Sequence, residues 1–299
     1  STVGGEHLVD KMVREGLNVV GIVSPEHGFR GTADAGEKVG NSVDERTGIP
    51  VWSLYGAHPR RLTDEQLRKF DIMVVDMQDV GLRFYTYYIT MLDAMAMCAE
   101  RGCPVVVLDR PNPNGMYVAG PVLDMRYKSG VGALPIPVVH GLTIGEIARM
   151  AVGEGWTKPV ALTVVPCENY THSTRYALPI APSPNLRTQH AVYLYPSTCL
   201  FEGTVCSLGR GTDFPFEVYG YPAMRGCAFS FTPRSVAGAK NPPLLGQKCF
   251  GVDLRGVPDE EIIAAGFNIE YVMDAYRRLG MGEKFFTPFF EKLVGVGYV

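Results

Sequence analysis

Acidic, basic and amide side chains follow directly after three apolar segments of this sequence. The first segment ends at Ser24 and leads into Glu26 and His27 within SPEHGFRG. A carboxylic acid beside an imidazole or an arginine is suited to general acid–base catalysis. The polar residues that follow the three segments are Glu26, His27, Arg30, Asp76, Gln78, Asp79, Arg83, Tyr85, Asp109, Arg110, Asn112 and Asn114. We expect them to line one polar site.

The elements that must position these side chains are predicted strands. Five runs rich in Val, Ile and Leu span 18–24, 50–55, 71–77, 104–109 and 161–166. Near-continuous apolar character is typical of strands buried on both faces of a parallel sheet. Ligands bind at the carboxyl ends of such strands, which is where the polar residues lie.

Three helices are predicted between these strands. Thr63 with Gln66, and Thr143 with Glu146, have the spacing of a capping box and indicate helix starts. An apolar stripe at helical spacing runs between Arg83 and Gly102, and the glycine indicates its end.

The sequence changes character after about residue 180, where Pro- and Gly-rich loops replace the periodic segments. One clear helix is predicted there, in PDEEIIAAGFN, with acidic residues in its first turn and Gly266 after its end. The residues thus predict an α/β domain at 1–180 with a parallel sheet, and a second, smaller α+β domain at 181–299.

Composition excludes several classes of protein. The chain has 299 residues, 46% of them hydrophobic, and a formal net charge of −3, which gives no basic surplus for nucleic acid. No apolar run is long enough to cross a bilayer. Seven cysteines without a C-x-x-C pair argue against a zinc knuckle or a complete disulfide framework. No dinucleotide fingerprint, P-loop or G-x-S-x-G elbow is present, so we expect no cofactor and no serine nucleophile.

Each polar residue also has a structural interpretation. An aspartate after a strand often caps the next helix, which applies to Asp79 and Asp109, and His27 can serve a structural role. Several carboxylates on adjacent strand ends would repel one another without compensation. Arg30, Arg83 and Arg110 can supply it, so a metal is not required.

Seven motifs in order along the chain resemble one known family. These motifs are SPEHGFRG, DMQDVGLRFYTY, LDRPNPNG, GLTIGEIA, PSPN, YPSTCLFEGT and GRGTDFPFE, and they resemble the NamZ-like exo-β-N-acetylmuramidases, long catalogued as a domain of unknown function. The resemblance implies a Rossmann-like N-terminal domain, a smaller C-terminal domain and a cleft between them. Relatives usually carry another strand before the first residue here and a helical segment after the last, so we expect the residues named here to be an incomplete site.

The implied activity is release of N-acetylmuramic acid from the non-reducing ends of peptidoglycan fragments. We predict Glu26 as the acid, oriented by His27, because a carboxyl group beside apolar strand residues can have its pKa raised. The candidates for the second catalytic group are Glu202, then Asp79 and Asp76. The acetamido group of the substrate can replace that carboxylate, and the residues leave the choice open.

Substrate contacts are predicted at two arginines and at nearby polar groups. A guanidinium is the expected partner of the lactyl carboxylate, and Arg210 between two glycines, or else Arg83, is the candidate. The remaining predicted substrate-binding residues are Arg30, Tyr85, Asn114 and Asn185.

Two other functions remain open on the residues alone. One is a metal-dependent hydrolase or phosphoesterase with Glu26, His27, Asp76 and Asp79 as ligands, and the other is a non-catalytic muropeptide-binding protein. A peptidoglycan substrate suggests a periplasmic or secreted protein, with the cytoplasm as the alternative.

Overall fold

The computed structural model describes residues 2–24, 41–54, 61–224 and 226–297, which have a mixed α/β fold. The chain divides into two units, each built from three stretches. Unit 1 holds Ser1–Asp79, Thr86–Asn112 and Leu142–Tyr170, and unit 2 holds Val80–Tyr85, Pro113–Gly141 and Thr171–Val299. The predicted division at residue 180 stays a prediction.

Each of the five predicted strands is present in unit 1. They are β3 (Ile22–Ser24), β5 (Pro50–Ser53), β6 (Met73–Val75), β7 (Val105–Leu108) and β8 (Leu162–Val165). Strands β6, β7 and β8 pair in that order and are all parallel, as predicted. Strand β3 pairs in parallel with β5, which also pairs with the antiparallel β4 (Ser42–Val43). A short antiparallel pair, β1 (Thr2–Val3) and β2 (Glu6–His7), precedes them.

Three of the four helices described in unit 1 were predicted, and α1 (Leu8–Arg14) was not. The other three are α2 (Asp64–Leu67), α3 (Tyr87–Arg101) and α4 (Ile144–Gly153). Both predicted capping boxes form, at Thr63 with Gln66 and at Thr143 with Glu146. Gly102 ends α3 in the left-handed conformation, at a φ of 73°.

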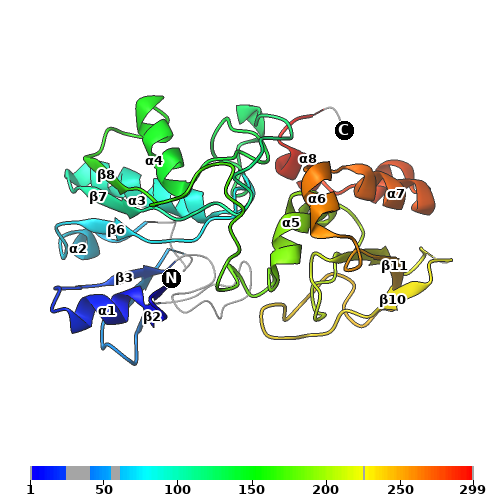
Figure 1. The fold of residues 1–299 in the computed structure, drawn as a ribbon, viewed down its shortest axis with the longest axis horizontal. Helices are drawn as coiled ribbons and strands as arrows, with labels where there is room; N and C mark the ends of the chain where they lie inside the picture. Colours follow the sequence, from blue (N-terminus) through cyan, green and yellow to red (C-terminus); the bar gives the residue numbers. More distant parts are fainter. Residues whose placement is uncertain (1, 25–40, 55–60, 225, 298–299) are drawn as a thin grey trace. The chain divides into compact units, whose positions relative to one another are not determined.

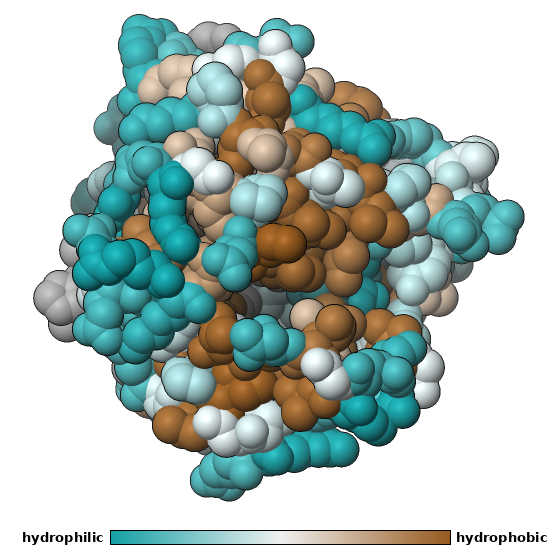
Figure 2. All heavy atoms as spheres, turned by 90° about the vertical axis from the view of Figure 1, so that its left-hand side faces the viewer, coloured by the Kyte–Doolittle hydropathy of each residue, from teal (hydrophilic) through white to brown (hydrophobic). Residues whose placement is uncertain are grey.

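Helices α3 and α4 pack on each other and on the sheet β6-β7-β8 (Figure 1). Burial is uneven among the side chains of this sheet. Val75 and Val107 are buried, whereas Val74 is 39% exposed and Val165 is 47% exposed. The prediction that these strands are buried on both faces is therefore wrong for β6 and β8. Figure 2 shows apolar side chains gathered in the middle of the face that looks left in Figure 1.

The described residues of unit 2 form an antiparallel sheet and four α-helices. The sheet has the order β10-β11-β9, with β9 at Val218–Tyr221, β10 at Phe229–Phe231 and β11 at Cys249–Asp253. The helices are α5 (Gln189–Thr198), α6 (Asp259–Ala265), α7 (Glu270–Leu279) and α8 (Phe289–Val294). Three short 3-10 helices are η1 (Met125–Tyr127), η2 (Cys199–Gly203) and η3 (Gly282–Phe285).

The helix predicted in PDEEIIAAGFN is α6, whereas α5, α7 and α8 were not predicted. In α5 the reason is physical: the eight residues from Ala191 to Thr198 are all buried, so no polar face gives a helical period. Pro196 within the segment also argues against a helix at the level of the sequence, because proline lacks the N–H that a helix interior uses. Within the described chain, none of the helices is both long and apolar enough to span a membrane.

Candidate active site

The geometry of unit 2 brings two predicted site residues into direct contact, Glu202 and Arg210. Nε and Nη2 of Arg210 both donate to Oε1 of Glu202, at 2.9 and 2.5 Å. The side chains of Glu202 and Arg210 keep 26% and 19% of their surface exposed, so the pair is partly open to solvent. Neither side chain makes any other hydrogen bond or ion pair within the described part of the chain.

Glu202 lies on η2, which continues directly from α5. Helix α8 packs against η2 so closely that a Cβ at Gly203 would lie 2.5 Å from Cα of Phe290. Main-chain hydrogen bonds from Thr287 N to Gly203 O and from Val205 N to Phe285 O tie the same segments together. The backbone beside Glu202 is therefore held by packing and by hydrogen bonds.

Arg210 is fixed by the glycines on either side of it. Gly209 and Gly211 have φ values of 87° and 82°, a region that favours glycine. A Cβ at Gly211 would lie 2.4 Å from the carbonyl oxygen of Arg234, so only glycine allows this close approach. Burial lowers the pKa of Arg210, but the Glu202 carboxylate outweighs it and the pKa is raised. Arg210 is therefore a fixed cation.

An aromatic cluster surrounds this pair on the buried side. The guanidinium of Arg210 lies over the ring of Phe216, at 5.0 Å from its centroid. The ring of Tyr195 meets Phe216, Phe84 and Tyr85 edge to face. Burial raises the pKa of Tyr195 well above its usual value, so this phenol stays neutral. Tyr195 and Phe216 were missed because nothing in the sequence distinguishes a ring beside a site from a ring in the core.

The predicted substrate-binding residue Arg83 is fully buried in unit 2. Its Nη1 donates to the carbonyls of Pro121 and Ile136, and its Nη2 to those of Leu293 and Val294. These four bonds give Arg83 a structural role in joining three segments of unit 2. Of the two candidates for the lactyl carboxylate, Arg210 is therefore the one with exposed surface.

The predicted residues Tyr85, Asn114 and Asn185 are each at most 5% exposed and contact main chain. The Tyr85 hydroxyl donates to Pro182 O, and the Asn185 amide donates to Gly238 O. The Asn114 amide donates to the carbonyls of Val80 and Val192. In the structure these side chains position loops, and substrate contact by any of them stays a prediction.

Unit 1 holds the predicted carboxylates Asp76 and Asp79. Oδ1 of Asp76 accepts a hydrogen bond from Nε of Arg110 at 2.5 Å, so the predicted compensation by an arginine occurs here. Asp79 is only 3% exposed. Asp109 accepts from Gly145 N and from the Thr143 hydroxyl at the start of α4, which is the structural role weighed for it.

The predicted acid Glu26, its neighbour His27 and the substrate-binding candidate Arg30 lie outside the described residues. Their roles therefore remain predictions from the sequence.

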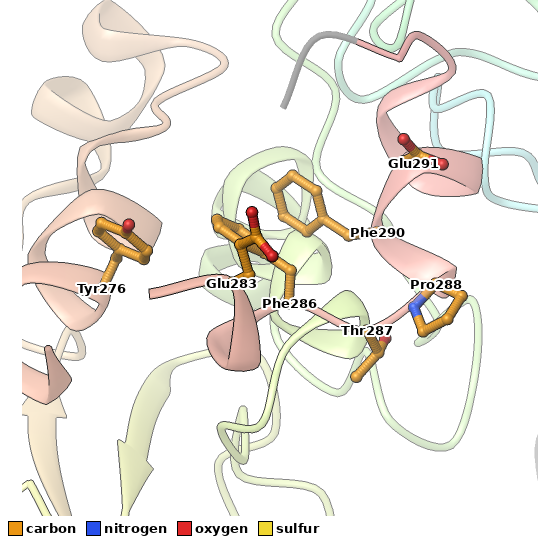
Figure 3. A pocket seen from close by; sticks show the side chains of 7 residues that line it. All are labelled: Tyr276, Glu283, Phe286, Thr287, Pro288, Phe290 and Glu291. Carbon is orange, nitrogen blue, oxygen red and sulfur yellow. The ribbon is translucent and has the colours of Figure 1, made fainter. Parts of the chain in front are cut away.

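An aromatic hollow also lies in unit 2, and none of the predicted site residues lines it. Figure 3 shows its lining, which is Tyr276, Glu283, Phe286, Thr287, Pro288, Phe290 and Glu291. The ring centroids of Phe286 and Phe290 are 4.6 Å apart, so these two lining residues pack on each other.

Comparison with known proteins assigns the chain to a family. The model for the N-terminal part of the exo-beta-N-acetylmuramidase NamZ matches residues 1–190, and the model for its C-terminal part matches residues 193–299. The chain therefore belongs to a family of glycoside hydrolases. That family is the exo-β-N-acetylmuramidase NamZ family, which the sequence motifs predict.

The relatives agree with this assignment. The peptidoglycan beta-N-acetylmuramidase NamZ of Bacillus subtilis (strain 168) is 38% identical over 300 residues, which cover 95% of this chain and 72% of the relative. Two solved structures of DUF1343 family proteins from Bacteroides fragilis NCTC 9343 are also similar. One is 55% identical, with a TM-score of 0.91 over 99% of this chain and 81% of its own. The other is 28% identical, with a TM-score of 0.76 over 96% of this chain and 79% of its own.

Proposed function

We propose that this protein is an exo-acting glycoside hydrolase that releases N-acetylmuramic acid from the non-reducing ends of peptidoglycan fragments. The observation that carries the proposal is the partly exposed pair of Glu202 and Arg210 in a chain of the NamZ family. It offers a carboxylate for the reaction and a guanidinium for the acidic substituent that distinguishes this sugar.

Hydrolysis requires a proton for the departing glycosidic oxygen and an attacking group at the anomeric carbon. We assign the proton donor to Glu26, as the sequence predicts. Glu202 is the second carboxylate, because it is the predicted candidate that lies beside Arg210, the proposed partner of the substrate's carboxylate. Such a group can attack the anomeric carbon, activate water or accept the N–H of the substrate's acetamido group.

Arg210 is the proposed partner of the lactyl carboxylate of the substrate. Two of its nitrogens, Nε and Nη2, are used by Glu202, and Nη1 makes no hydrogen bond in the described chain. A guanidinium has five N–H donors, so one Arg210 can hold both carboxylates.

The decisive experiment uses a synthetic N-acetylmuramic acid glycoside with the wild type, Glu26→Gln and Glu202→Gln. We expect release by the wild type and at least a 100-fold lower rate in both variants, on the scale of losing acid–base catalysis. Glu283→Gln in the aromatic hollow is the matched control and should keep full activity. Full activity of Glu202→Gln would contradict its role. NMR of the first product anomer then separates retention from inversion.

The same assay separates the proposal from its alternatives. Activity that survives a strong chelator argues against a metal-dependent hydrolase. Binding of the glycoside without release by the wild type would indicate a non-catalytic muropeptide-binding protein instead.

We further propose that unit 1 is Rossmann-like and that the protein acts in the periplasm or is secreted. The parallel order β6-β7-β8, with α3 and α4 between successive strands, supports the first point. The location of peptidoglycan supports the second. Fractionation of cells that produce the protein tests it, and recovery in the cytoplasm alone would contradict it.

A further inference from the structure

A bulky aromatic residue, Phe216, has a backbone conformation that normally requires glycine. Its φ is 69°, and its side chain is only 1% exposed. Such a conformation is an outlier for a large side chain and is retained only where the surroundings impose it.

The local sequence explains how the chain reaches this conformation. Glu217 N donates to Phe214 O, which closes a turn with Pro215 and Phe216 at its centre. Proline followed by a residue of positive φ is the pattern of a type II turn, in which the second central residue is usually Gly or Asn. Phe216 therefore occupies a glycine position, which costs stability unless its ring makes compensating contacts.

The ring of Phe216 contacts both Arg210 and the aromatic cluster. The Arg210 guanidinium lies over it, at 5.0 Å from the centroid. Tyr195 meets it edge to face, at 4.9 Å between centroids. A hydrogen bond from Phe216 N to Leu208 O, 2.8 Å long, closes the loop that carries both Arg210 and Phe216.

We propose that Phe216 is a positioning residue that holds the plane of Arg210, so that one edge of the guanidinium meets Glu202 and Nη1 stays directed to the substrate. A cation over an aromatic face is attracted to it, and the planar guanidinium aligns with the ring. The positive φ at Phe216 directs its ring towards the guanidinium of Arg210. The selectivity part of this inference rests on the proposed function.

The first test is substrate selectivity, the ratio of kcat/KM for N-acetylmuramic acid and N-acetylglucosamine glycosides. Phe216→Met keeps apolar bulk without a ring face, and we expect it to lower the ratio by about 10-fold. Phe216→Tyr restores the ring and should stay within about 3-fold of the wild type. An unchanged ratio in Phe216→Met would overturn the proposal, since a purely structural role changes stability without changing selectivity.

A matched control isolates the effect of the backbone conformation. Leu244 also has a positive φ, 59°, and packs on the cluster of Val218, Phe231 and Cys249 rather than on Arg210. Leu244→Gly relieves the same kind of strain, and we expect it to leave the selectivity ratio within 2-fold of the wild type. If Leu244→Gly lowered the selectivity ratio as much as Phe216→Met does, the ratio would respond to any disturbance of the loops and not to Phe216 in particular.

The second test requires neither activity nor a folded variant at position 216. In the wild type, ¹H–¹⁵N NMR of arginine side chains should show the Arg210 Nε–H resonance shifted by the aromatic ring, with Arg210→Lys used for its assignment. A resonance at the ordinary arginine position would refute the positioning role. If the wild type cleaves neither glycoside, the proposed function fails, and this NMR result still decides whether Phe216 holds Arg210.

Discussion

Glu202 and Arg210 illustrate at the scale of single residues what the structure adds to the sequence. The motifs identify each of them as a candidate, one for catalysis and one for the lactyl group. The structure shows that they bind each other, which links the two roles. This pairing was not predicted because Glu202 and Arg210 are eight positions apart in a segment without a regular helical or strand period. The sequence therefore does not fix the distance between their side chains.

Replacing Arg210 should alter substrate choice more than overall rate. We expect Arg210→Ala to weaken transition-state binding of N-acetylmuramic acid substrates by about 2–4 kcal/mol more than that of N-acetylglucosamine analogues, the scale of truncating one partner of a charge pair. The measurement is kcat/KM on both substrates.

The control is another arginine with the same kinds of contact. Arg255 pairs with Asp253 and lies over Phe214, at 4.3 Å from its centroid. Arg255→Ala should leave the selectivity unchanged. Equal losses on both substrates in Arg210→Ala would remove the lactyl contact from the proposal.

At the scale of elements, the capping residues predict the starts of α2 and α4 correctly because a capping box is a local signal. The five strands are also predicted correctly, since apolar runs mark them. Helix α5 was not predicted, and the exposure of Val165 on β8 was not predicted either. In both places burial depends on packing between segments that are distant in the sequence.

Packing of α8 on η2 predicts a strong effect at Gly203. A Cβ there would lie 2.5 Å from Phe290 Cα, so Gly203→Ala should lower the free energy of unfolding by about 1–3 kcal/mol, as overpacking does. It should also lower activity, since Glu202 is the preceding residue. Thermal unfolding and the glycoside assay measure the two effects.

Gly153 at the end of α4 provides the comparison for that substitution. A Cβ at Gly153 meets nothing within 4 Å, so Gly153→Ala should be neutral or slightly stabilising. Similar losses in the two variants would show that the close approach of α8 to η2 does not control stability.

Asp109 joins the end of β7 to the start of α4. Its side chain accepts from Arg110 N, Gly145 N and the Thr143 hydroxyl, at 3.0, 2.8 and 2.7 Å. Asp109→Ala should therefore lower the free energy of unfolding by about 1–3 kcal/mol. Urea unfolding measures it, with the exposed Asp64→Ala as control. A loss of activity without a loss of stability would instead give Asp109 a chemical role.

At the scale of the whole molecule, a buried histidine should make folding depend on pH. Burial and the positive charge of Arg83 lower the pKa of His140 to about 3. In the unfolded chain the pKa is about 6.5. Between these values the unfolded state binds a proton that the folded state does not bind, so stability falls as pH falls from about 6.5 towards 3.

Urea unfolding at several pH values between 7 and 4 measures this dependence. His140→Gln should flatten it, whereas the exposed His172→Gln should leave it unchanged. An identical slope in His140→Gln and the wild type would show that other groups cause the acid sensitivity.

The four hydrogen bonds that Arg83 donates to main-chain carbonyls form a clamp between distant segments. This clamp limits how the N- and C-terminal parts of related proteins can be exchanged. The two family models meet between residues 190 and 193, yet Arg83 before that junction donates to Leu293 and Val294 after it. A chimera joined there takes the arginine from one parent and two of its acceptors from the other. Because all four acceptors are main-chain carbonyls, the clamp needs no matching side chains from the second parent. Such hybrids should fold wherever the first parent supplies the arginine and the second keeps the backbone path of α8.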